Sequence, residues 1–524
     1  MATPTTSEQV TQIGPSSQTH IDALLFGSKW GGPVGTGLTL TYSFPTYGSS
    51  WSTAAIGSGG YGASTGSGEP WANRLSPLSA VQQSAFSQAL QAWSAVANIS
   101  FAQVADTSSM VGDIRVAFST AVSSSTSAHA YYPYHPEGAG GDVWINPNTT
   151  STTSFQPTSF GFYVMVHEIG HALGLKHPFD DSPTLPASTD NARYTVMSYD
   201  DAPSTTIFPS TPMLYDIAAI QYLYGANTSY RTGNDLYQFS ASSEELRTIW
   251  DAGGTDTLDA SNQILSATLN LNAGTFSSIG VRNNGGAATS NVGIAYGATI
   301  ENARGGTASD LILGNTGGNV LDGNSGNDTL YAGSGRDELY GGGNDDRLFG
   351  NRGEDTLFGG GDQDILFGGV DNDLLFGGDG DDRLQADDGV DLLFGNRGSD
   401  MLFGNLGNDT LYGGSDDDLL YSGRDSDLVY GDAGNDTLSG DQGNDTLYGG
   451  DGADIFRFHI GDGNDTVMDF TFSAGDRLET SSSRGYALTS SGTGEAIIDF
   501  LNGDKITLSG ISAGQVTSSW FVFV

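Results

Sequence analysis

Hydrophobic residues in the first 229 positions alternate between the spacing of strands and the spacing of helices. Residues 38–44 alternate apolar with small polar residues, which favours a strand. Residues 78–96 carry apolar residues at helical spacing, and Ser76 or its neighbour is the expected N-cap, with Pro77 in the first turn. Similar patterns predict strands over residues 113–119 and 141–146, a helix from residue 160 and another over residues 213–224. Together these elements predict an α+β domain.

Beyond residue 305 the pattern changes to a nine-residue period without insertions. Residues 305–457 divide into seventeen units of the form G-G-x-G-x-D-x-L-x, for example residues 323–331. Six turn residues, where Gly allows positive φ, precede a three-residue strand that buries the apolar residue at position eight. Two units close one turn, so the period predicts an all-β parallel β-roll. A disordered acidic linker is the alternative, but disorder does not require an inward apolar residue at every ninth position.

Three other segments flank these two regions. Residues 1–19 are rich in Ser, Thr and Gln and are expected to form a mobile tail or a short pro-segment. Residues 230–304 read as a β linking region, because they are rich in Gly and Asn and show no helix signal. Residues 458–524 alternate apolar and polar positions and end in an apolar run that could be a last strand, an export address, or both. The predicted domains are therefore the α+β unit of residues 20–229, the roll of residues 305–457, and these three segments.

Composition and charge narrow the class of partner. The 524 residues include no Cys and carry a net charge of −42. Disulfides and thiolate ligands are excluded, so any metal must be held by His and oxygen. Electrostatic repulsion makes nucleic acid and anionic membranes poor partners, whereas divalent cations are natural ones. We expect no membrane span, because no apolar run approaches about 18 residues.

The N-terminal residues do not carry an ordinary cleaved signal peptide. The first 28 residues contain no Lys or Arg, and residues 1–20 contain no apolar run. Either the protein stays inside the cell, or it leaves by a route that reads another signal.

The negative charge is concentrated in the roll. Residues 305–457 contain 30 Asp, 2 Glu and 7 Arg, which gives a net charge of −25. Position six is Asp in sixteen of the seventeen units, and Asn319 is the exception. Carboxylates and turn carbonyls that line up between turns form oxygen cages suited to several structural Ca²⁺ ions. The candidate calcium ligands in the roll are Asp310, Asp328, Asp337, Asp346, Asp355, Asp364, Asp373, Asp382, Asp391, Asp400, Asp409, Asp418, Asp427, Asp436, Asp445 and Asp454.

The most specific motif predicts one catalytic zinc ion. His167, Glu168, His171, Gly174 and His177 have the spacing H-E-x-x-H-x-x-G-x-x-H. Two His four residues apart share a helix face and can bind Zn²⁺. Gly174 can end the helix in a left-handed conformation, so that His177 returns to the same ion. One position remains for water, which Glu168 could reach as a general base.

A structural role remains the simpler explanation for an isolated His such as His20, His129, His135 or His459. A structural role does not explain the complete template, because three His, one Glu and one Gly at this spacing are improbable by chance. Met197, within residues 194–199, follows the motif as expected for a Met-containing turn beneath a zinc site.

The zinc motif, the Met-turn and the nonapeptide array, in this order, resemble the serralysins, which are secreted metzincin zinc proteases with calcium-binding RTX repeats. The resemblance covers nearly the whole chain from Ile21 onward. It implies a metzincin domain followed by an RTX roll, with His167, His171 and His177 as zinc ligands and Glu168 as base. It further implies that Tyr199, two residues after Met197, stabilises the oxyanion. Further calcium loops are implied ahead of the array, with Arg231, Gly233, Asp235, Asp251, Gly253 and Asp256 as candidate ligands.

The same resemblance implies an extracellular protease that leaves the cell through type I export machinery reading its C-terminal region. We expect polypeptide substrates, bound along an edge strand near residues 128–132, and a monomeric protein. A calcium-dependent surface-binding protein is the competing class, but an intact Glu168 argues against it because a scaffold needs no base.

Three features depart from the family pattern. Only nineteen residues separate His177 from Met197, which affects the expected substrate pocket. No acidic residue directly precedes the terminal apolar run. Residues that replace Gly at position four of their repeats could alter calcium loops, and they include Asn344, Asp362, Asp371, Asp416 and Asp425.

Overall fold

The computed structural model describes residues 9–51, 61, 74–133, 139–150, 154–481 and 485–524. Residues 1–8 of the predicted tail, together with Tyr134 and His135, lie outside this described part. The chain divides into two compact units, which alternate along the sequence. The first comprises residues 1–235, 242–256 and 273–300, and the second comprises residues 236–241, 257–272 and 301–524. The predicted linking region, residues 230–304, therefore contributes to both units.

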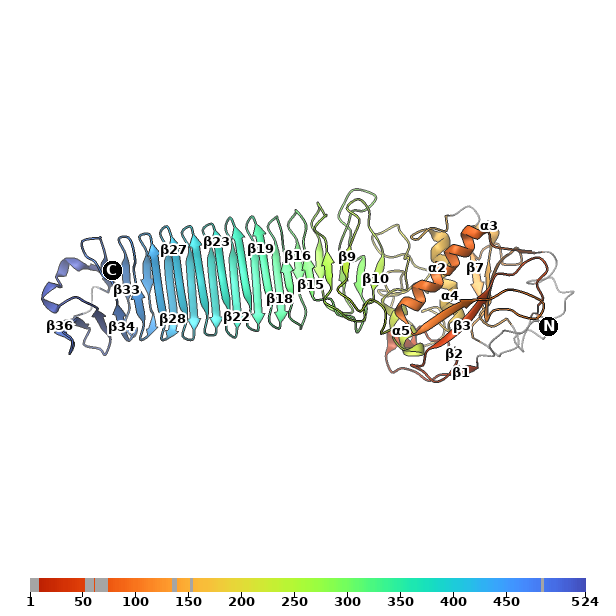
Figure 1. Cartoon of the computed structure of the whole chain (residues 1–524), viewed down its shortest axis with the longest axis horizontal. Coiled ribbons are helices and arrows are strands. Elements are labelled where there is room, and N and C mark those ends of the chain that lie inside the picture. The colour runs from red at the N-terminus through yellow and green to blue at the C-terminus, as the bar shows by residue number, and fades with distance from the viewer. Residues whose placement is uncertain (1–8, 52–60, 62–73, 134–138, 151–153, 482–484) are drawn as a thin grey trace. The chain divides into compact units, whose positions relative to one another are not determined.

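A mixed β-sheet forms the centre of the first unit (Figure 1). Its strand order is β5-β3-β6-β8-β7, and β4 pairs with β6. β3, β5, β6 and β8 run parallel, whereas β7 is antiparallel to β8 and forms one edge. The strands are β3 (Leu38–Ser43), β4 (Leu75–Ser76), β5 (Ile99–Gln103), β6 (Ile114–Ser119), β7 (Ala128–Ala130) and β8 (Val143–Ile145).

Five helices accompany this sheet among the described residues: α1 (Thr19–Asp22), α2 (Ala80–Val96), α3 (Pro147–Thr150), α4 (Phe160–Ala172) and α5 (Leu214–Tyr224). α2 packs against α4, and the indole Nε1 of Trp93 donates a hydrogen bond to the carbonyl oxygen of Val166 at 3.1 Å. The unit also contains the antiparallel pair β1 (Val10–Gln12) and β2 (Ser28–Trp30). A small sheet of order β10-β14-β13 completes it, with β10 (Arg247–Ile249), β13 (Phe276–Ser277) and β14 (Val292–Ile294).

The predicted start of α2 was wrong by a few residues. Ser79 is the N-cap, because its hydroxyl accepts from the backbone N–H of Gln82 while the Gln82 side chain accepts from the Ser79 N–H, which is a capping box. Ser76 instead belongs to β4. Val81 is 65% exposed, whereas Phe86 and Trp93 are buried, so the apolar face begins one turn later than expected.

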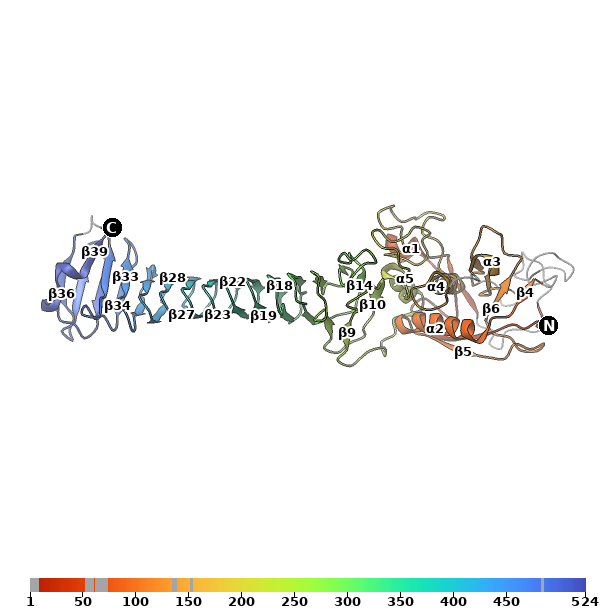
Figure 2. The same cartoon turned by 90° about the horizontal axis from the view of Figure 1, so that it is seen from above.

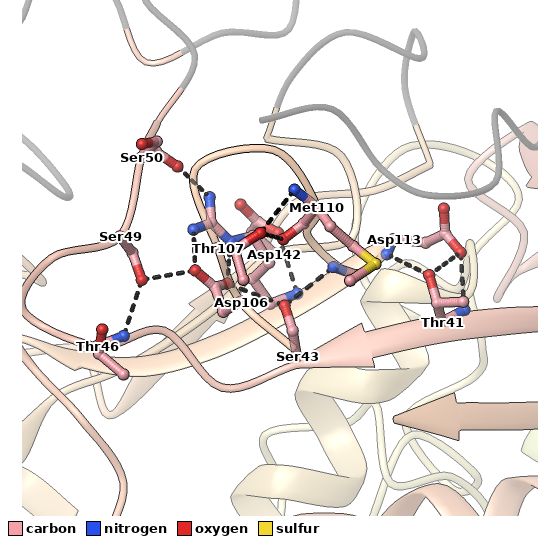
Figure 3. Close-up of polar contacts among 12 residues, drawn as sticks. Thr41, Ser43, Thr46, Ser49, Ser50, Asp106, Thr107, Met110, Asp113 and Asp142 are labelled. Atoms are coloured by element: carbon pink, nitrogen blue, oxygen red, sulfur yellow. Dashed lines mark hydrogen bonds and ion pairs between the residues drawn. The ribbon is translucent and has the colours of Figure 1, made fainter. Parts of the chain in front are cut away.

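A buried polar network fastens the loop between β5 and β6 to β3 (Figure 3). The guanidinium of Arg115 forms a bidentate pair with Asp106, with both N–O distances at 2.9 Å. The hydroxyl of Ser43, at the end of β3, donates to the same carboxylate at 2.9 Å. Asp113 accepts from the backbone N–H and the hydroxyl of Thr41, both at 2.7 Å. Because each buried charge has fixed partners, the network holds β6 in place beside β3.

The second unit is a parallel β-roll built from two facing sheets (Figures 1 and 2). From β15 to β30 successive strands go to alternate sheets, and up to the pair β28–β30 each strand pairs in parallel with the strand two positions on. Near the C-terminus, β36, β37 and β38 instead pair antiparallel within one sheet. One sheet contains β9 (Leu236–Gln238), β11 (Thr257–Asp259), β15 (Asn302–Arg304), β17 (Val320–Asp322), β19 (Glu338–Gly343), β21 (Thr356–Gly361), β23 (Leu374–Asp379), β25 (Leu392–Arg397), β27 (Thr410–Ser415), β29 (Leu428–Ala433), β32 (Thr446–Tyr448), β34 (Asn464–Val467), β36 (Ala487–Ser490), β37 (Ala496–Asp499) and β38 (Lys505–Leu508).

The other sheet contains β12 (Thr268–Asn270), β16 (Leu311–Leu313), β18 (Thr329–Ser334), β20 (Arg347–Arg352), β22 (Ile365–Val370), β24 (Arg383–Asp388), β26 (Met401–Leu406), β28 (Leu419–Asp425), β30 (Thr437–Ser439), β31 (Gln442–Gly443), β33 (Ile455–Phe458), β35 (Arg477–Thr480) and β39 (Phe521–Phe523). The terminal apolar run is therefore a strand, β39, which pairs with β35. Two short 3₁₀ helices, Ala513–Gln515 and Ser518–Trp520, precede it.

The register confirms that two repeats close one turn. Leu339 pairs with Leu357, eighteen residues later, and both are fully buried. The predicted strand length of three residues was wrong for the central strands, which have six residues or, in β28, seven. They are longer because pairing continues through the first turn residues, as between Gly342 and Gly360.

Aromatic residues at position nine form a ladder on the outer face of the longer sheet. Neighbouring ring centroids are 4.7–5.0 Å apart and the rings are tilted by 2–14°. Each such pair contributes about 0.5–1.5 kcal/mol beyond its burial, so the ladder adds stability along the stack. The rings belong to Tyr340, Phe358, Phe376, Phe394, Tyr412, Tyr430 and Tyr448.

The Asn and Asp replacements at position four named above keep the turn conformation. Asn344 has φ +78° and Asp362 has φ +70°, and position-four Gly residues such as Gly326 and Gly353 also have positive φ. Asn and Asp tolerate this conformation better than other side chains. The turns therefore keep their path at these positions.

No helix in the described part of the chain combines the length and the apolar character that a membrane crossing requires.

The roll core yields a matched test of inward and outward positions. Leu393 is fully buried, whereas its neighbour Leu392 points outward and is half-buried. We expect Leu393→Ala to lower the free energy of unfolding by about 2–5 kcal/mol, because it leaves a cavity between the sheets. Leu392→Ala should lower it much less. Urea unfolding of the calcium-loaded chain, followed by far-UV circular dichroism, measures both, and equal losses would contradict the inward assignment.

Candidate metal centre and active site

Three imidazoles converge at the C-terminal end of α4. His167 and His171 lie one turn apart on the helix, and the chain turns back at Gly174, which has φ +106°. A Cβ at Gly174 would lie 2.4 Å from the carbonyl oxygen of Ser28, so this position excludes a side chain for steric reasons as well. One ligand nitrogen from each of His167, His171 and His177 lies within 4.8 Å of the others. The structure thus brings together the three predicted zinc ligands.

The Nδ1 atom of each ring is held by an oxygen outside the helix. His167 Nδ1 lies 2.6 Å from the carbonyl oxygen of Val196, and His171 Nδ1 lies 2.7 Å from that of Leu175. His177 Nδ1 lies 2.9 Å from the carboxylate of Asp180. Carbonyl and carboxylate oxygens accept, so Nδ1 carries the proton and Nε2 keeps its lone pair.

The environment keeps these rings neutral. Burial lowers the pKa of His167 to about 4 and also lowers the pKa values of His171 and His177. Three neutral imidazoles with free Nε2 lone pairs form a donor set that fits Zn²⁺ and leaves a fourth position open. The residues present therefore fit the metal that the motif predicts.

Glu168 lies beside these rings and is only 4% exposed. Burial raises the pKa of its carboxyl to about 8. Its Oε2 atom has no hydrogen-bond partner within the described part of the chain. A buried carboxylate oxygen without a partner is costly in a purely structural role, and its position suits a proton acceptor in the site.

The Met-turn packs beneath the rings. Met197 is fully buried, and a Cβ at Gly170 would lie 2.5 Å from its sulfur, so α4 needs Gly at this point. Asp216 on α5 accepts from the hydroxyl of Thr195 at 2.6 Å and from the backbone N–H of Val196 at 2.7 Å. These contacts fix the carbonyl of Val196 that holds His167.

Tyr199 follows the turn and remains exposed at its outer edge. Its side chain is 69% exposed, and its ring centroid lies 4.6 Å from that of His177 and 5.9 Å from that of His167. The ring therefore borders the imidazoles, as the sequence resemblance implied.

Our interpretation of the sequence missed Asp180, Asp216 and Tyr163, whose hydroxyl donates to the carbonyl oxygens of Val196 and Ser198 at 3.1 and 2.9 Å. Asp180 carries a detectable signal, because it is a carboxylate three residues after the last His of the motif. Asp216 and Tyr163 carry none, because their partners are far away in the sequence.

The predicted early calcium loops place three carboxylates together. Oxygens of Asp235, Asp251 and Asp256 lie within 4.8 Å of one another, and the latter two residues are buried. The backbone N–H of Gly253 donates to Asp251 at 2.9 Å, and Arg231 pairs through its guanidinium with Asp235 at 3.2 Å. Gly233 lies beside them, since a Cβ at Gly254 would be 2.0 Å from its carbonyl oxygen.

The position-six carboxylates of the roll each connect two turns. Asp346, for example, accepts through Oδ1 from the backbone N–H of Asp328 at 2.7 Å, and Asp364 accepts likewise from Asp346 at 2.8 Å. The Oδ2 atoms of both are buried and have no hydrogen-bond partner among the residues that the structure describes. A Cβ at Gly341 would lie 2.6 Å from Asp346 Oδ2 and 2.6 Å from the carbonyl oxygen of Gly359. Gly thus leaves an oxygen-lined space between turns, which fits Ca²⁺.

Burial raises the pKa of these carboxyls, to about 8 for Asp364 and about 7 for Asp346, because no positive group offsets the charge. Two positions at the start of the array differ. Both oxygens of Asp310 accept backbone hydrogen bonds, from Ala267 and Gly306. The amide of Asn319 donates to the carbonyl oxygen of Glu301 at 2.8 Å and so does not leave a buried oxygen unpaired. These two positions therefore differ from the later repeats in leaving no unpaired carboxylate oxygen.

The zinc-site geometry and the roll define a metzincin-type domain joined to an RTX roll, and family comparisons agree. Residues 73–206 match the family described as Matrixin. Residues 215–522, more than half of the chain, match the family described as Peptidase M10 serralysin C terminal. The chain therefore belongs to the serralysin family.

Similar curated proteins carry serralysin or metallopeptidase names. Serralysin C of Dickeya chrysanthemi is 35% identical over 252 residues, 43% of this chain and 51% of that protein. Serralysin of Photorhabdus luminescens is 36% identical over 47% of this chain and 55% of that protein. Metallopeptidase AprA of Pseudomonas marginalis is 34% identical over 53% of this chain and 60% of that protein. The chain thus spans between about half and three-fifths of the length of these relatives. A solved structure, that of extracellular lipase LipA from Serratia marcescens, aligns with 33% of this chain and 40% of its own chain. The two are 20% identical there, with a TM-score of 0.16.

The contact between Asp180 and His177 predicts an effect on metal affinity. Asp180→Asn should weaken zinc binding about 10–100-fold, because the carboxylate fixes the ring and raises its basicity. Asp181→Asn is the matched control, since the contact of Asp181 with Lys176 uses only its backbone carbonyl. Competition with a chromogenic chelator measures both affinities. Equal zinc affinities for the two variants would contradict a role of the Asp180 carboxylate in zinc binding.

Proposed function

We propose that this protein is a secreted zinc-dependent endopeptidase that hydrolyses extracellular polypeptides and whose roll folds around calcium. The observation that carries the proposal is the convergence of His167, His171 and His177 beside a buried Glu168 whose Oε2 lacks a partner within the described part of the chain. A site built only for structure would not keep an unpaired carboxylate next to an open coordination position. Membership of the serralysin family supports the same conclusion.

The zinc ion, held by the three His, would polarise the scissile carbonyl and lower the pKa of an attacking water to about 7. Glu168 takes the proton of that water and passes it to the leaving amine. The hydroxyl of Tyr199 donates to the carbonyl oxygen as negative charge develops on it. The substrate main chain binds in extended form along β7, the edge strand of the sheet.

The roll carries the calcium part of the proposal. With a net charge of −25 between residues 305 and 457, it repels itself unless cations neutralise the carboxylates. Inside a cell, where free calcium is scarce, the array remains unfolded and can pass through a type I exporter. Outside the cell, calcium folds it, and the chain acts as a monomer.

The base assignment predicts a large effect on rate with little effect on metal. Glu168→Ala should lower kcat by at least about 10²–10⁴-fold, which is the usual contribution of a general base. Zinc content and the thermal unfolding profile should stay close to those of the unsubstituted protein, because Glu168 is not a ligand. Peptide hydrolysis and zinc content are measured on the same preparation. Hydrolysis near the normal rate would show that another group accepts the proton.

Calcium removal tests the roll. In excess chelator, the far-UV circular dichroism of the full chain should lose much of its β signal, and added calcium should restore it. Binding to the folded state alone contributes about 2.7 kcal/mol per site at a hundredfold excess over Kd, so several sites suffice to fold the roll. Magnesium is the control, since it dehydrates reluctantly and fits these sites poorly. A full β signal in chelator would show that the roll folds without calcium. It would also contradict the proposed link between calcium-dependent folding and export.

A further inference from the structure

A pocket of about 310 Å³ opens beside the zinc-site residues, and the proposed mechanism assigns it no role. We call it the side pocket. Its lining includes the buried residues His167 and Glu168 and the exposed residue Tyr199. Its volume is at the lower end of the roughly 300–1,000 Å³ typical of ligand pockets, which suits one large side chain. It is lined by Ser125, Thr126, Ser127, Ala128, Phe160, Tyr163, Val164, His167, Glu168, Ser198, Tyr199, Asp201 and Phe208.

Aromatic side chains line much of the wall. Phe160 and Phe208 have ring centroids 5.3 Å apart, and Tyr163 and Phe208 have centroids 5.4 Å apart in a stacked arrangement. Such a wall favours the apolar stem of a long side chain and, at its ring faces, a cation.

The charge in the lining is negative and comes from two carboxylates. Glu168 belongs to the proposed chemistry, so Asp201 is the acidic group left over. Asp201 is exposed, and its carboxylate accepts no hydrogen bond and forms no ion pair among the described residues. Asp201 and Tyr163 both line the side pocket. No Lys or Arg lines the side pocket.

The loop that carries Asp201 and Phe208 is fastened at three points. The guanidinium of Arg193 donates to the carbonyl oxygen of Pro203 at 2.6 Å. The hydroxyl of Thr205 donates to the buried carboxylate of Glu244 at 2.8 Å. Farther along, the amide of Asn283 donates to the hydroxyl of Thr206 at 3.2 Å. The pocket is therefore formed before a substrate binds, which allows it to discriminate between side chains.

We propose that the side pocket receives the side chain of a substrate residue flanking the cleaved bond, and that Asp201 makes this pocket favour lysine or arginine. The stem of such a side chain packs against Phe160, Tyr163 and Phe208, and its cationic end reaches the unpaired carboxylate of Asp201. The inference rests on the proposed peptidase function and names its substrate class.

The test uses peptides that differ only in one residue next to the cut. A peptide cleaved by the unsubstituted protein is mapped by mass spectrometry, and the residue on either side of the cut is replaced in turn by lysine, norleucine or glutamate. Norleucine keeps the stem of lysine without its charge. On one side of the cut, lysine should give the highest kcat/KM and glutamate the lowest, and the preference should weaken as salt screens it.

Asp201→Asn should lower kcat/KM for the lysine peptide about three- to tenfold and leave the norleucine peptide nearly unchanged, as expected for the loss of one partly exposed ion pair. Asp200→Asn is the matched control, because Asp200 is also exposed but does not line the pocket. An unchanged ratio of lysine to norleucine in Asp201→Asn would overturn the assignment. Failure of the unsubstituted, zinc-loaded protein to cleave any peptide would instead overturn the proposed function.

Discussion

The buried carboxylate at position six of the repeats, from Asp328 to Asp454, is the constraint on which the roll depends. One oxygen accepts a backbone N–H from the preceding turn, as Asp364 does from Asp346. The other oxygen stays buried without a hydrogen bond among the described residues, so the same side chain that joins two turns also places uncompensated charge between them. A core of one leucine per repeat is too thin to offset that cost. Residues 305–457 contain 7 Arg against 32 acidic residues, so the calcium ions proposed above would offset charge that the chain itself leaves uncompensated.

Repetition explains why the sequence predicted the roll well. A nine-residue period specifies the inward residue, the turn glycines and the eighteen-residue register together, so a local pattern determines the long-range pairing. The period did not predict how far each strand extends, because pairing through residues such as Gly342 depends on the neighbouring turn. The period also did not predict the backbone conformation of the residues that replace glycine. In the structure Asn344 and Asp362 adopt positive φ.

The zinc site was predictable in its ligands and less so in its supports. The ligands lie within eleven residues, where helix geometry and one glycine suffice to bring them together. Their supports come from elsewhere: Val196 O for His167, and Asp216, twenty residues beyond Val196, for the turn that carries that carbonyl. Such contacts depend on tertiary packing and leave no spacing to detect. The predicted start of α2 was wrong for a related reason. Ser76 and Ser79 are both residue types that cap helices, but Ser76 belongs to β4 and Ser79 is the N-cap.

The two compact units alternate along the chain, and this order limits how the protein can be divided. After residue 235 the chain enters the roll for residues 236–241 and returns to the first unit for residues 242–256. It then enters the roll again for residues 257–272 and returns to the first unit for residues 273–300. The match to the serralysin C-terminal family likewise begins at residue 215, inside α5 of the first unit. No single cut therefore yields two intact pieces, and no single recombination point exchanges one unit for another. Transfer of one unit alone would need a separate junction at each of the boundaries between the two units.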